Sequence, residues 1–173
     1  NYKSQSNSLS SGQVLGCDCD YNGGKLIVKE MVDLLCLELV EKELVTDSIT
    51  LHIGYNNRFN KQSAHGTIRM TVTTSSAKEM IKYAVQLYDQ IIDRHTPIHR
   101  FSVTFNHVVD KAYQQYDLFT DLEEVEKEYK LQKAMLGIKD RYGKNSILKG
   151  MNLQEGATTM ERNRQIGGHR SGS

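Results

Sequence analysis

The sequence predicts an α+β fold: a four-stranded antiparallel sheet in the order β-α-β-β-α-β, with both helices on one face and a C-terminal helical extension. Two observations support this prediction. Four segments alternate apolar and polar residues with the period of a half-buried strand, and two longer segments place apolar residues at helical spacing. Their order along the 173-residue chain is that of two split βαβ units.

The strands are predicted over residues 8–15, 48–55, 67–74 and 98–109. In the second of these, Ile49, Leu51 and Ile53 alternate with Thr50 and His52. We expect the apolar residues of each strand to face the helices. The other face should then be open, polar, slightly basic and without carboxylates. It would carry Thr50, His52, Arg69, Thr71, Thr73, Arg100, Ser102 and Thr104.

Two amphipathic helices are predicted, over residues 25–45 and 77–95. The first follows a loop at residues 22–24 and carries enough carboxylates to form an acidic surface opposite the sheet. Cys36 lies among its apolar residues and is expected to be a small core side chain. Pro97 prevents the second helix from continuing.

A change of character after residue 110 suggests three divisions: a domain over 1–110, a short linker peptide over 111–120 and a C-terminal helix with a flexible tail over 121–173. Asp121 is placed to cap a helix over 121–141, whose thin apolar stripe would be Leu122, Val125, Tyr129 and Leu136. From Gly150 on, Gly, Thr, Asn and Arg dominate, so we expect poor packing there.

Composition excludes several function classes. No run of 18 apolar residues is present, so the sequence predicts no membrane span, and the first residues have no apolar segment typical of a signal peptide. Three sparse cysteines argue against a disulfide scaffold and fit a cytoplasmic protein. Neither metal-ligand spacing, a phosphate loop nor a nucleophile with a base is apparent. This chain alone is therefore expected to catalyse nothing.

Four stretches resemble a known family. Residues 8–15 (SLSSGQVL) follow the pattern S-x-S-x-G-x-x-L, and residues 49–55 (ITLHIGY) and 66–73 (GTIRMTVT) are similar to the family's second and third strands. The tail over 144–169 completes the likeness. Together they resemble the little finger, the C-terminal domain of Y-family translesion DNA polymerases, in the UmuC-like (ImpB/MucB/SamB) branch of Gram-positive bacteria.

The resemblance implies a DNA-binding module of an error-prone lesion-bypass polymerase that grips the primer-template backbone in DNA repair and the SOS response. The parent protein would be a DNA-directed DNA polymerase whose catalytic carboxylates and Mg²⁺ belong to a palm domain, so no cofactor, small-molecule substrate or membrane partner is expected for this chain. The DNA contacts carried over are Ser8, Ser10, Ser11, Arg58, Lys61, Arg69, Thr71 and Thr73.

A second motif follows the last strand. Gln115, Tyr116, Asp117, Leu118 and Phe119 are similar to the sliding-clamp-binding peptide of bacterial polymerases, Q-x-[S/D]-L-F. In that role the leucine and phenylalanine would fill an apolar cleft of the clamp, while the glutamine would anchor the peptide through hydrogen bonds. The alternative is that the two apolar residues pack the C-terminal helix onto the domain.

Two other functions remain open from the sequence. The same ferredoxin-like sheet could be a protein-interaction module with no DNA role, its polar face pairing with another subunit. An RNA-binding sheet that stacks bases on aromatic side chains is disfavoured, because the exposed positions Arg69, Thr71 and Thr73 are not aromatic.

Overall fold

The computed structural model describes residues 7–166 and 169–170. Residues 1–6 of the predicted domain and residues 167–168 and 171–173 of the predicted tail lie outside the described residues. The strands are β1 (Leu9–Cys19), β2 (Leu44–Tyr55), β3 (Ala64–Thr74), β4 (Ile98–Asn106), β5 (Val109–Asp110), β6 (Gln165–Ile166) and β7 (His169–Arg170). The α-helices are α1 (Tyr21–Glu41), α2 (Ala77–Ile91), α3 (Leu122–Tyr142) and α4 (Thr159–Arg162). Short 3₁₀ turns cover Asn57–Phe59, Lys111–Tyr113 and Gly150–Leu153.

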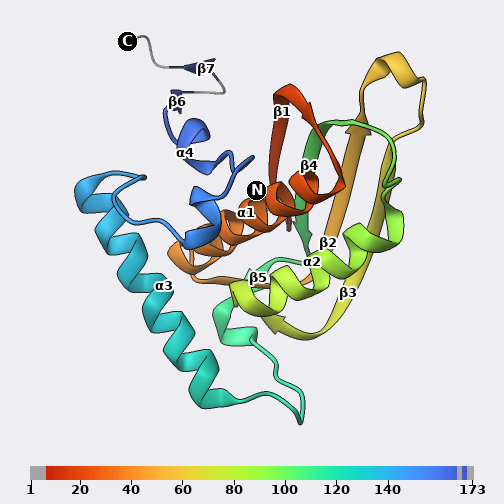
Figure 1. Ribbon diagram of the computed structural model, residues 1–173. Coiled ribbons are helices and arrows are strands. Elements are labelled where there is room, and N and C mark those ends of the chain that lie inside the picture. Colours follow the sequence, from red (N-terminus) through yellow and green to blue (C-terminus); the bar gives the residue numbers. More distant parts are fainter. Residues whose placement is uncertain (1–6, 167–168, 171–173) are drawn as a thin grey trace, which may run out of the picture.

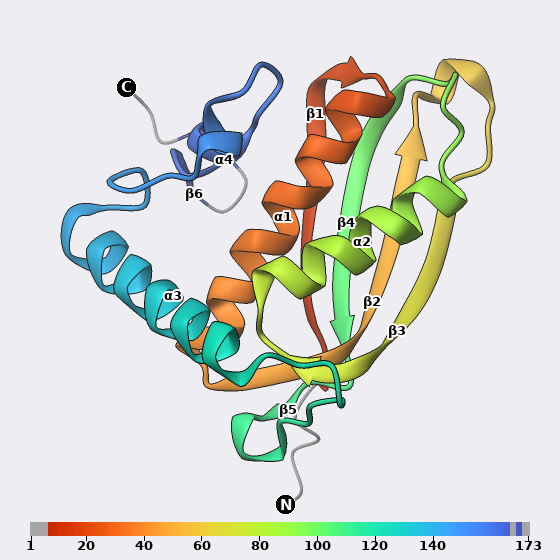
Figure 2. The ribbon, with the colours of Figure 1, turned by 60° about the horizontal axis from the view of Figure 1, so that its bottom comes forward.

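The main sheet has the strand order β1-β4-β2-β3, with every neighbouring pair antiparallel. Helices α1 and α2 cross one face of it, and none of the helices that the structure describes lies on the other face (Figures 1 and 2). Strand β4 separates β1 from β2, and β2 separates β3 from β4. These are two split βαβ units, so the predicted fold class is confirmed.

The core lies between the sheet and the two helices. Each of the alternating residues Ile49, Leu51 and Ile53 is fully buried, as are Val103 and Phe105 of β4. Cys36 is also fully buried, as predicted, and burial raises the pKa of its thiol well above the usual value. The strand alternation therefore predicted the buried face of the central strands correctly.

Helix α1 begins earlier than predicted. Asp20 caps it by accepting a 2.8 Å hydrogen bond from the backbone N–H of Gly23. Residues 22–24, predicted as a loop and helix start, therefore lie within the first helical turn. Gly24 allows α2 to approach closely, because a Cβ there would lie 2.4 Å from the Tyr88 hydroxyl. That hydroxyl donates a 2.7 Å hydrogen bond to the carbonyl of Tyr21.

Two residues with a left-handed backbone conformation mark strand boundaries that the sequence pattern did not predict. Helix α1 ends at Glu41, and Glu43 adopts a φ of 55°, so the chain turns and β2 starts at Leu44. At the other end of the sheet, His107 has a φ of 49° and ends β4. The predicted fourth strand is thereby divided, and its last part forms β5, which pairs with the start of β2.

Helix α3 packs beside α1, with Asp121 as its N-cap as predicted. Its buried residues are Gln132 and Met135, whereas Leu122 of the predicted stripe is 58% exposed. Gln132 donates a 3.1 Å hydrogen bond to the carbonyl of Ser75. Val125, Tyr129 and Leu136 of the predicted stripe are half-buried, so the prediction was wrong only for Leu122. It also missed Gln132, because an apolar pattern does not reveal a polar contact residue.

Poor packing was expected from Gly150 on, and this was wrong for Asn152, Thr158 and Thr159, which contact α1, whereas residues 153–156 between them are exposed. Lys149 pairs with Asp33, and Glu30 accepts hydrogen bonds from the side chain of Asn152 and the backbone N–H groups of Thr158 and Thr159. Both carboxylates lie on α1 and are almost fully buried, at 1% exposure for Glu30 and 3% for Asp33. This part of the predicted acidic surface is therefore an internal contact.

Among the described residues, no helix is long and apolar enough to cross a membrane.

Candidate nucleic-acid interface and exposed Leu–Phe segment

The open face of the sheet is built from cross-strand rows of polar residues. One row consists of Ser10, Thr104, Thr50 and Thr67, which are paired across all four long strands. Paired residues in antiparallel strands point to the same side of a sheet. Since the intervening residues are the buried core positions, this hydroxyl row lies on the face opposite the helices. Thr50 and Thr67 share a 2.7 Å hydrogen bond, which uses the proton of one of these two hydroxyls. Ser10, Thr104 and the other hydroxyl of that pair can donate to phosphate oxygens without adding charge.

The next row along the sheet contains Gly12, Ser102, His52 and His65. The two histidines are exposed, and their ring centroids are 6.2 Å apart. A third row contains Val14, Arg100 and Gly54. The outer face is therefore polar with a few cationic groups, as the alternation predicted.

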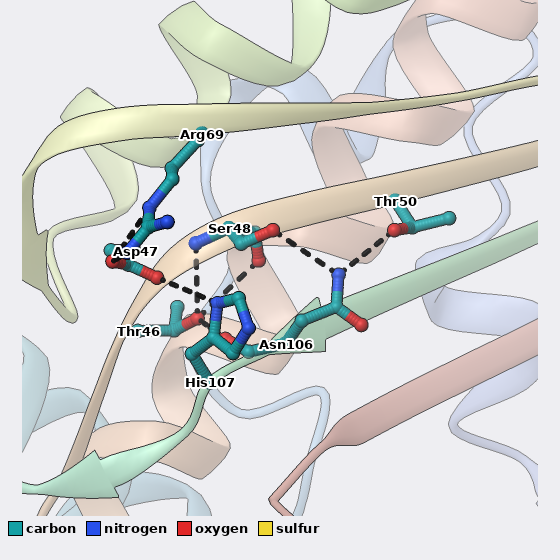
Figure 3. A network of polar contacts seen from close by, with 7 residues as sticks. All are labelled: Thr46, Asp47, Ser48, Thr50, Arg69, Asn106 and His107. Atoms are coloured by element: carbon teal, nitrogen blue, oxygen red, sulfur yellow. Dashed lines mark hydrogen bonds and ion pairs between the residues drawn. The ribbon is translucent and has the colours of Figure 1, made fainter.

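A carboxylate interrupts this face, contrary to prediction. Asp47 lies at the end of the face and accepts from Arg69 at 3.3 Å and from His107 at 3.3 Å (Figure 3). The alternation did not reveal it because Asp47 directly precedes the predicted strand, while β2 extends back to Leu44. Arg69 is exposed as predicted, but a nearby anion offsets its charge.

The same network fixes the neighbouring hydroxyls. The side-chain amide of Asn106 donates to Ser48 at 3.3 Å and to Thr50 at 2.8 Å, and the Thr46 hydroxyl donates to the carbonyl of Asn106 (Figure 3). This end of the face is therefore internally hydrogen-bonded.

The three predicted serines divide between two surfaces. Ser8 directly precedes β1 and is exposed, and Ser10 lies in the hydroxyl row. Ser11 is paired with the buried Val103, so it lies on the helix side of the sheet. There it accepts a 3.1 Å hydrogen bond from Arg162 of α4. The structure thus does not bring Ser11 together with Ser10 on the open face, because successive strand residues alternate sides.

The predicted loop residues Arg58 and Lys61 are both exposed, beyond the end of β2. Lys61 forms an ion pair with Asp93, which follows α2. The Lys61 hydrogen bond, with further bonds from the His95 backbone N–H and the Thr96 hydroxyl, holds the pKa of Asp93 well below its usual value. Arg58 lies over the ring of Phe59 at 5.8 Å. Of the two predicted loop cations, Lys61 already has an anionic partner.

Thr71 and Thr73 form hydrogen bonds with the segment that follows β5. The backbone N–H of Thr73 donates to the carbonyl of Gln115 at 3.1 Å, and the Thr71 hydroxyl donates to Asp117 at 3.1 Å. The structure therefore joins two predicted sites that are about 40 residues apart in the sequence. Neither pattern by itself indicated this contact.

Leu118 and Phe119 are almost completely exposed, at 99% and 95%. The interpretation that they pack the C-terminal helix onto the domain is therefore wrong. Asp117 shapes the turn that presents them: its side chain accepts from the Phe119 backbone N–H at 3.0 Å and from the Thr120 hydroxyl at 2.8 Å. These bonds, with the Thr120 hydroxyl contributing most, lower the pKa of Asp117.

Sequence reasoning placed Arg100 on the open face but not among the DNA contacts. Its side chain lies across Gly54, where a Cβ would be 2.5 Å from Arg100 Cγ. The signal that could have singled it out is this pairing of an arginine with a glycine on the adjacent strand, which becomes visible only once the register is known.

The family model for the impB/mucB/samB family C-terminal domain matches residues 6–118. The chain belongs to this family. The resemblance to the ImpB/MucB/SamB branch is thereby confirmed. The matched range covers the whole main sheet, both of its helices and all but the last residue of the motif over 115–119, called here the Leu–Phe segment.

Two curated relatives of this impB/mucB/samB domain share its sequence at low identity. The "Putative UV-damage repair protein UvrX" of Bacillus subtilis (strain 168) is 26% identical over 148 residues, covering 83% of this chain and 35% of the relative. "DNA polymerase IV" of Pelotomaculum thermopropionicum is 28% identical over 142 residues, covering 82% of this chain and 34% of the relative. The chain thus spans about a third of the length of the relatives it matches.

Solved structures give weaker likenesses to this impB/mucB/samB domain. "Insertion ternary complex of Dbh DNA polymerase" has a TM-score of 0.46 at 14% identity, covering 61% of this chain and 30% of that one. "Complex of beta-clamp processivity factor and little finger domain of PolIV" has a TM-score of 0.45 at 10% identity, covering 65% of this chain and 99% of that one.

Proposed function

We propose that this impB/mucB/samB domain is the DNA-binding little finger of a lesion-bypass DNA polymerase, which holds the primer-template backbone during DNA repair. Membership of the family supports this, as do the relatives named for DNA polymerase IV and UV-damage repair. A role in the SOS response and in translesion synthesis belongs to the same proposal. Catalysis would reside in a palm domain that these residues do not contain.

The observation that carries the proposal is the hydroxyl row on the open sheet face. Ser10, Thr104, Thr50 and Thr67 form a polar strip that crosses four strands and carries no charge. Hydroxyl donors suit phosphate oxygens, and contacts of this kind fix a protein on a duplex without reading its sequence. Such binding suits an enzyme that has to travel along any template.

The Leu–Phe segment supports a second part of the proposal, recruitment to a sliding clamp. Two large apolar side chains exposed next to each other carry a cost in water that a partner's apolar cleft would remove. The turn around Asp117 presents Leu118 and Phe119 in advance, which lowers the entropic cost of binding. Residues 111–120 would then be the clamp-binding peptide, residues 1–110 the DNA-binding domain and residues 121–173 a C-terminal extension.

The test is fluorescence anisotropy of a labelled primer-template duplex titrated with this chain over a series of salt concentrations. We expect affinity to fall with salt, with a slope of about 0.9 per neutralised phosphate. Absence of binding at low salt would contradict the proposal. It would favour the alternative, a protein-interaction module without a DNA role, for which clamp binding by the same chain is the next measurement.

A further inference from the structure

The Leu–Phe segment is attached to the edge of the main sheet. Strand β3 is the last strand in the order β1-β4-β2-β3, so one of its edges faces away from the other long strands. At Thr73 the segment occupies that edge: the Thr73 backbone N–H donates to the Gln115 carbonyl at 3.1 Å in an antiparallel bridge. In the same register Asp117 lies opposite Thr71, whose hydroxyl donates to its carboxylate at 3.1 Å. The segment is therefore fastened to β3 at two points.

The direction of the second hydrogen bond is fixed by chemistry. The Thr120 hydroxyl contributes most to the lowered pKa of Asp117, and Thr71 adds to it, so this carboxyl is ionised at neutral pH. An ionised carboxylate only accepts hydrogen bonds, so Thr71 has to donate its proton to it. The Tyr83 hydroxyl of α2 lies 3.5 Å from the Thr71 hydroxyl and can then only donate to it. Groups on α2 and β3 thus both direct protons toward the segment.

The groups that fasten the segment differ from those that a partner would contact. Gln115 is held through its backbone carbonyl, and its side chain is exposed. Leu118 and Phe119 are 99% and 95% exposed, and only the backbone N–H of Phe119 takes part in the turn around Asp117. The attachment to β3 therefore uses none of the three side chains that the motif would present to a clamp.

Attachment of this kind affects binding through conformational entropy. A segment that samples many conformations loses them when a partner binds, and this loss is subtracted from the affinity. The bonds from Thr71 and Thr73 restrict the segment when the domain folds, before any partner arrives. A larger fraction of the molecules then presents the binding conformation, which raises the association rate.

We propose that Thr71 is a positioning residue for clamp binding: through Asp117 it holds residues 115–119 on β3, and a sliding clamp binds the segment while it stays attached there. This inference rests on the proposed clamp recruitment and specifies how the peptide is presented. It adds to the peptide a residue of the folded domain that lies 46 residues before Asp117. It also places the clamp against the β3 edge of the sheet.

The test measures binding of the full chain to an immobilised bacterial sliding clamp by surface plasmon resonance. Thr71→Val removes the hydroxyl and keeps the shape, so it is expected to weaken binding about threefold, chiefly through slower association. Thr71→Ser keeps a hydroxyl and is expected to restore the affinity. Thr96→Val is the matched control, because the Thr96 hydroxyl also donates to an aspartate, Asp93, at 2.8 Å, and Thr96 follows the far end of α2. This control is expected to bind as the unaltered chain does.

Two further measurements connect the effect to the attachment. Asp117→Ala removes the acceptor, and adding Thr71→Val to it is expected to cost no further affinity, because both substitutions break the same hydrogen bond. Hydrogen exchange of the Thr73 amide, which donates to Gln115, is expected to become faster in Thr71→Val. A thermal melt of each variant verifies that the domain remains folded.

The outcomes separate this inference from the proposed function. If Thr71→Val associates with the clamp as fast as Thr96→Val does, the positioning role is overturned and clamp recruitment stands. Tighter binding by Thr71→Val would also overturn the role, since the attachment would then have to break before the clamp binds. Additive losses in the Thr71/Asp117 double variant would overturn the route through Asp117. Failure of the unaltered chain to bind the clamp would overturn the proposed recruitment and the inference with it.

Discussion

The buried carboxylate of Glu30 on α1 accepts a 2.7 Å hydrogen bond from the side-chain amide of Asn152, 122 residues further along the chain. The Thr158 backbone N–H donates to the same carboxylate at 2.7 Å. A carboxylate is stable in such a buried place only with several donors around it. The C-terminal segment is thus part of the domain's packing.

This relationship predicts that Glu30→Ala destabilises the protein by about 3 kcal/mol, because the donors of Asn152, Thr158 and Thr159 lose a buried acceptor. Chemical denaturation measures the free energy of unfolding. The exposed Glu155 supplies a matched control, since Glu155→Ala is expected to change stability by less than about 0.5 kcal/mol. Equal stability of the two variants would show that the C-terminal contact contributes nothing.

Substituting Leu118→Ala together with Phe119→Ala is expected to weaken binding to a bacterial sliding clamp at least about tenfold, because a few buried apolar side chains dominate such interfaces. Stability and DNA affinity should stay unchanged, since both side chains are exposed. Surface plasmon resonance on an immobilised clamp measures the effect. Leu131→Ala with Leu153→Ala removes two exposed leucines elsewhere and is the control. If the Leu118→Ala, Phe119→Ala variant binds the clamp as tightly as the unaltered chain does, this peptide is not the clamp contact.

Asp47→Asn is expected to tighten duplex binding about threefold at low salt, because Arg69 loses its anionic partner and the face gains one positive charge. The stability cost should be below about 1 kcal/mol, as for other exposed ion pairs. Anisotropy titrations and thermal melts measure the two effects. Unchanged affinity would mean that the backbone does not approach this end of the sheet.

The thermal midpoint is expected to hold between about pH 7 and 5 and to fall as the pH drops below the ordinary aspartate value of 3.8. The pKa of Asp93 is lowered in the folded state, chiefly by Lys61, so its contribution is present above that value and is lost as acid protonates the folded carboxyl. Asp93→Asn should have a lower midpoint at neutral pH and a shallower acid decline. Asp140→Asn on α3 is the control, and identical acid profiles for both variants would contradict the assignment.

Much of the fold follows from local patterns. The alternation of Ile49, Leu51 and Ile53 with polar residues identifies the buried face of β2, because successive strand residues point to opposite sides. Helical spacing locates α1 and α2 in the same way. Boundaries were less predictable, since backbone turns at Glu43 and His107 leave no mark in an apolar pattern.

The sequence by itself determined the two-layer fold, the polar character of the open face and the Leu–Phe motif, since each depends on residues close together in the chain. Tertiary structure alone decided which groups on that face are available. Asp47 reaches Arg69, Asp117 reaches Thr71, and Glu30 is enclosed by the tail. Such pairings depend on strand register and on contacts between segments far apart in the chain, which local sequence patterns do not reveal.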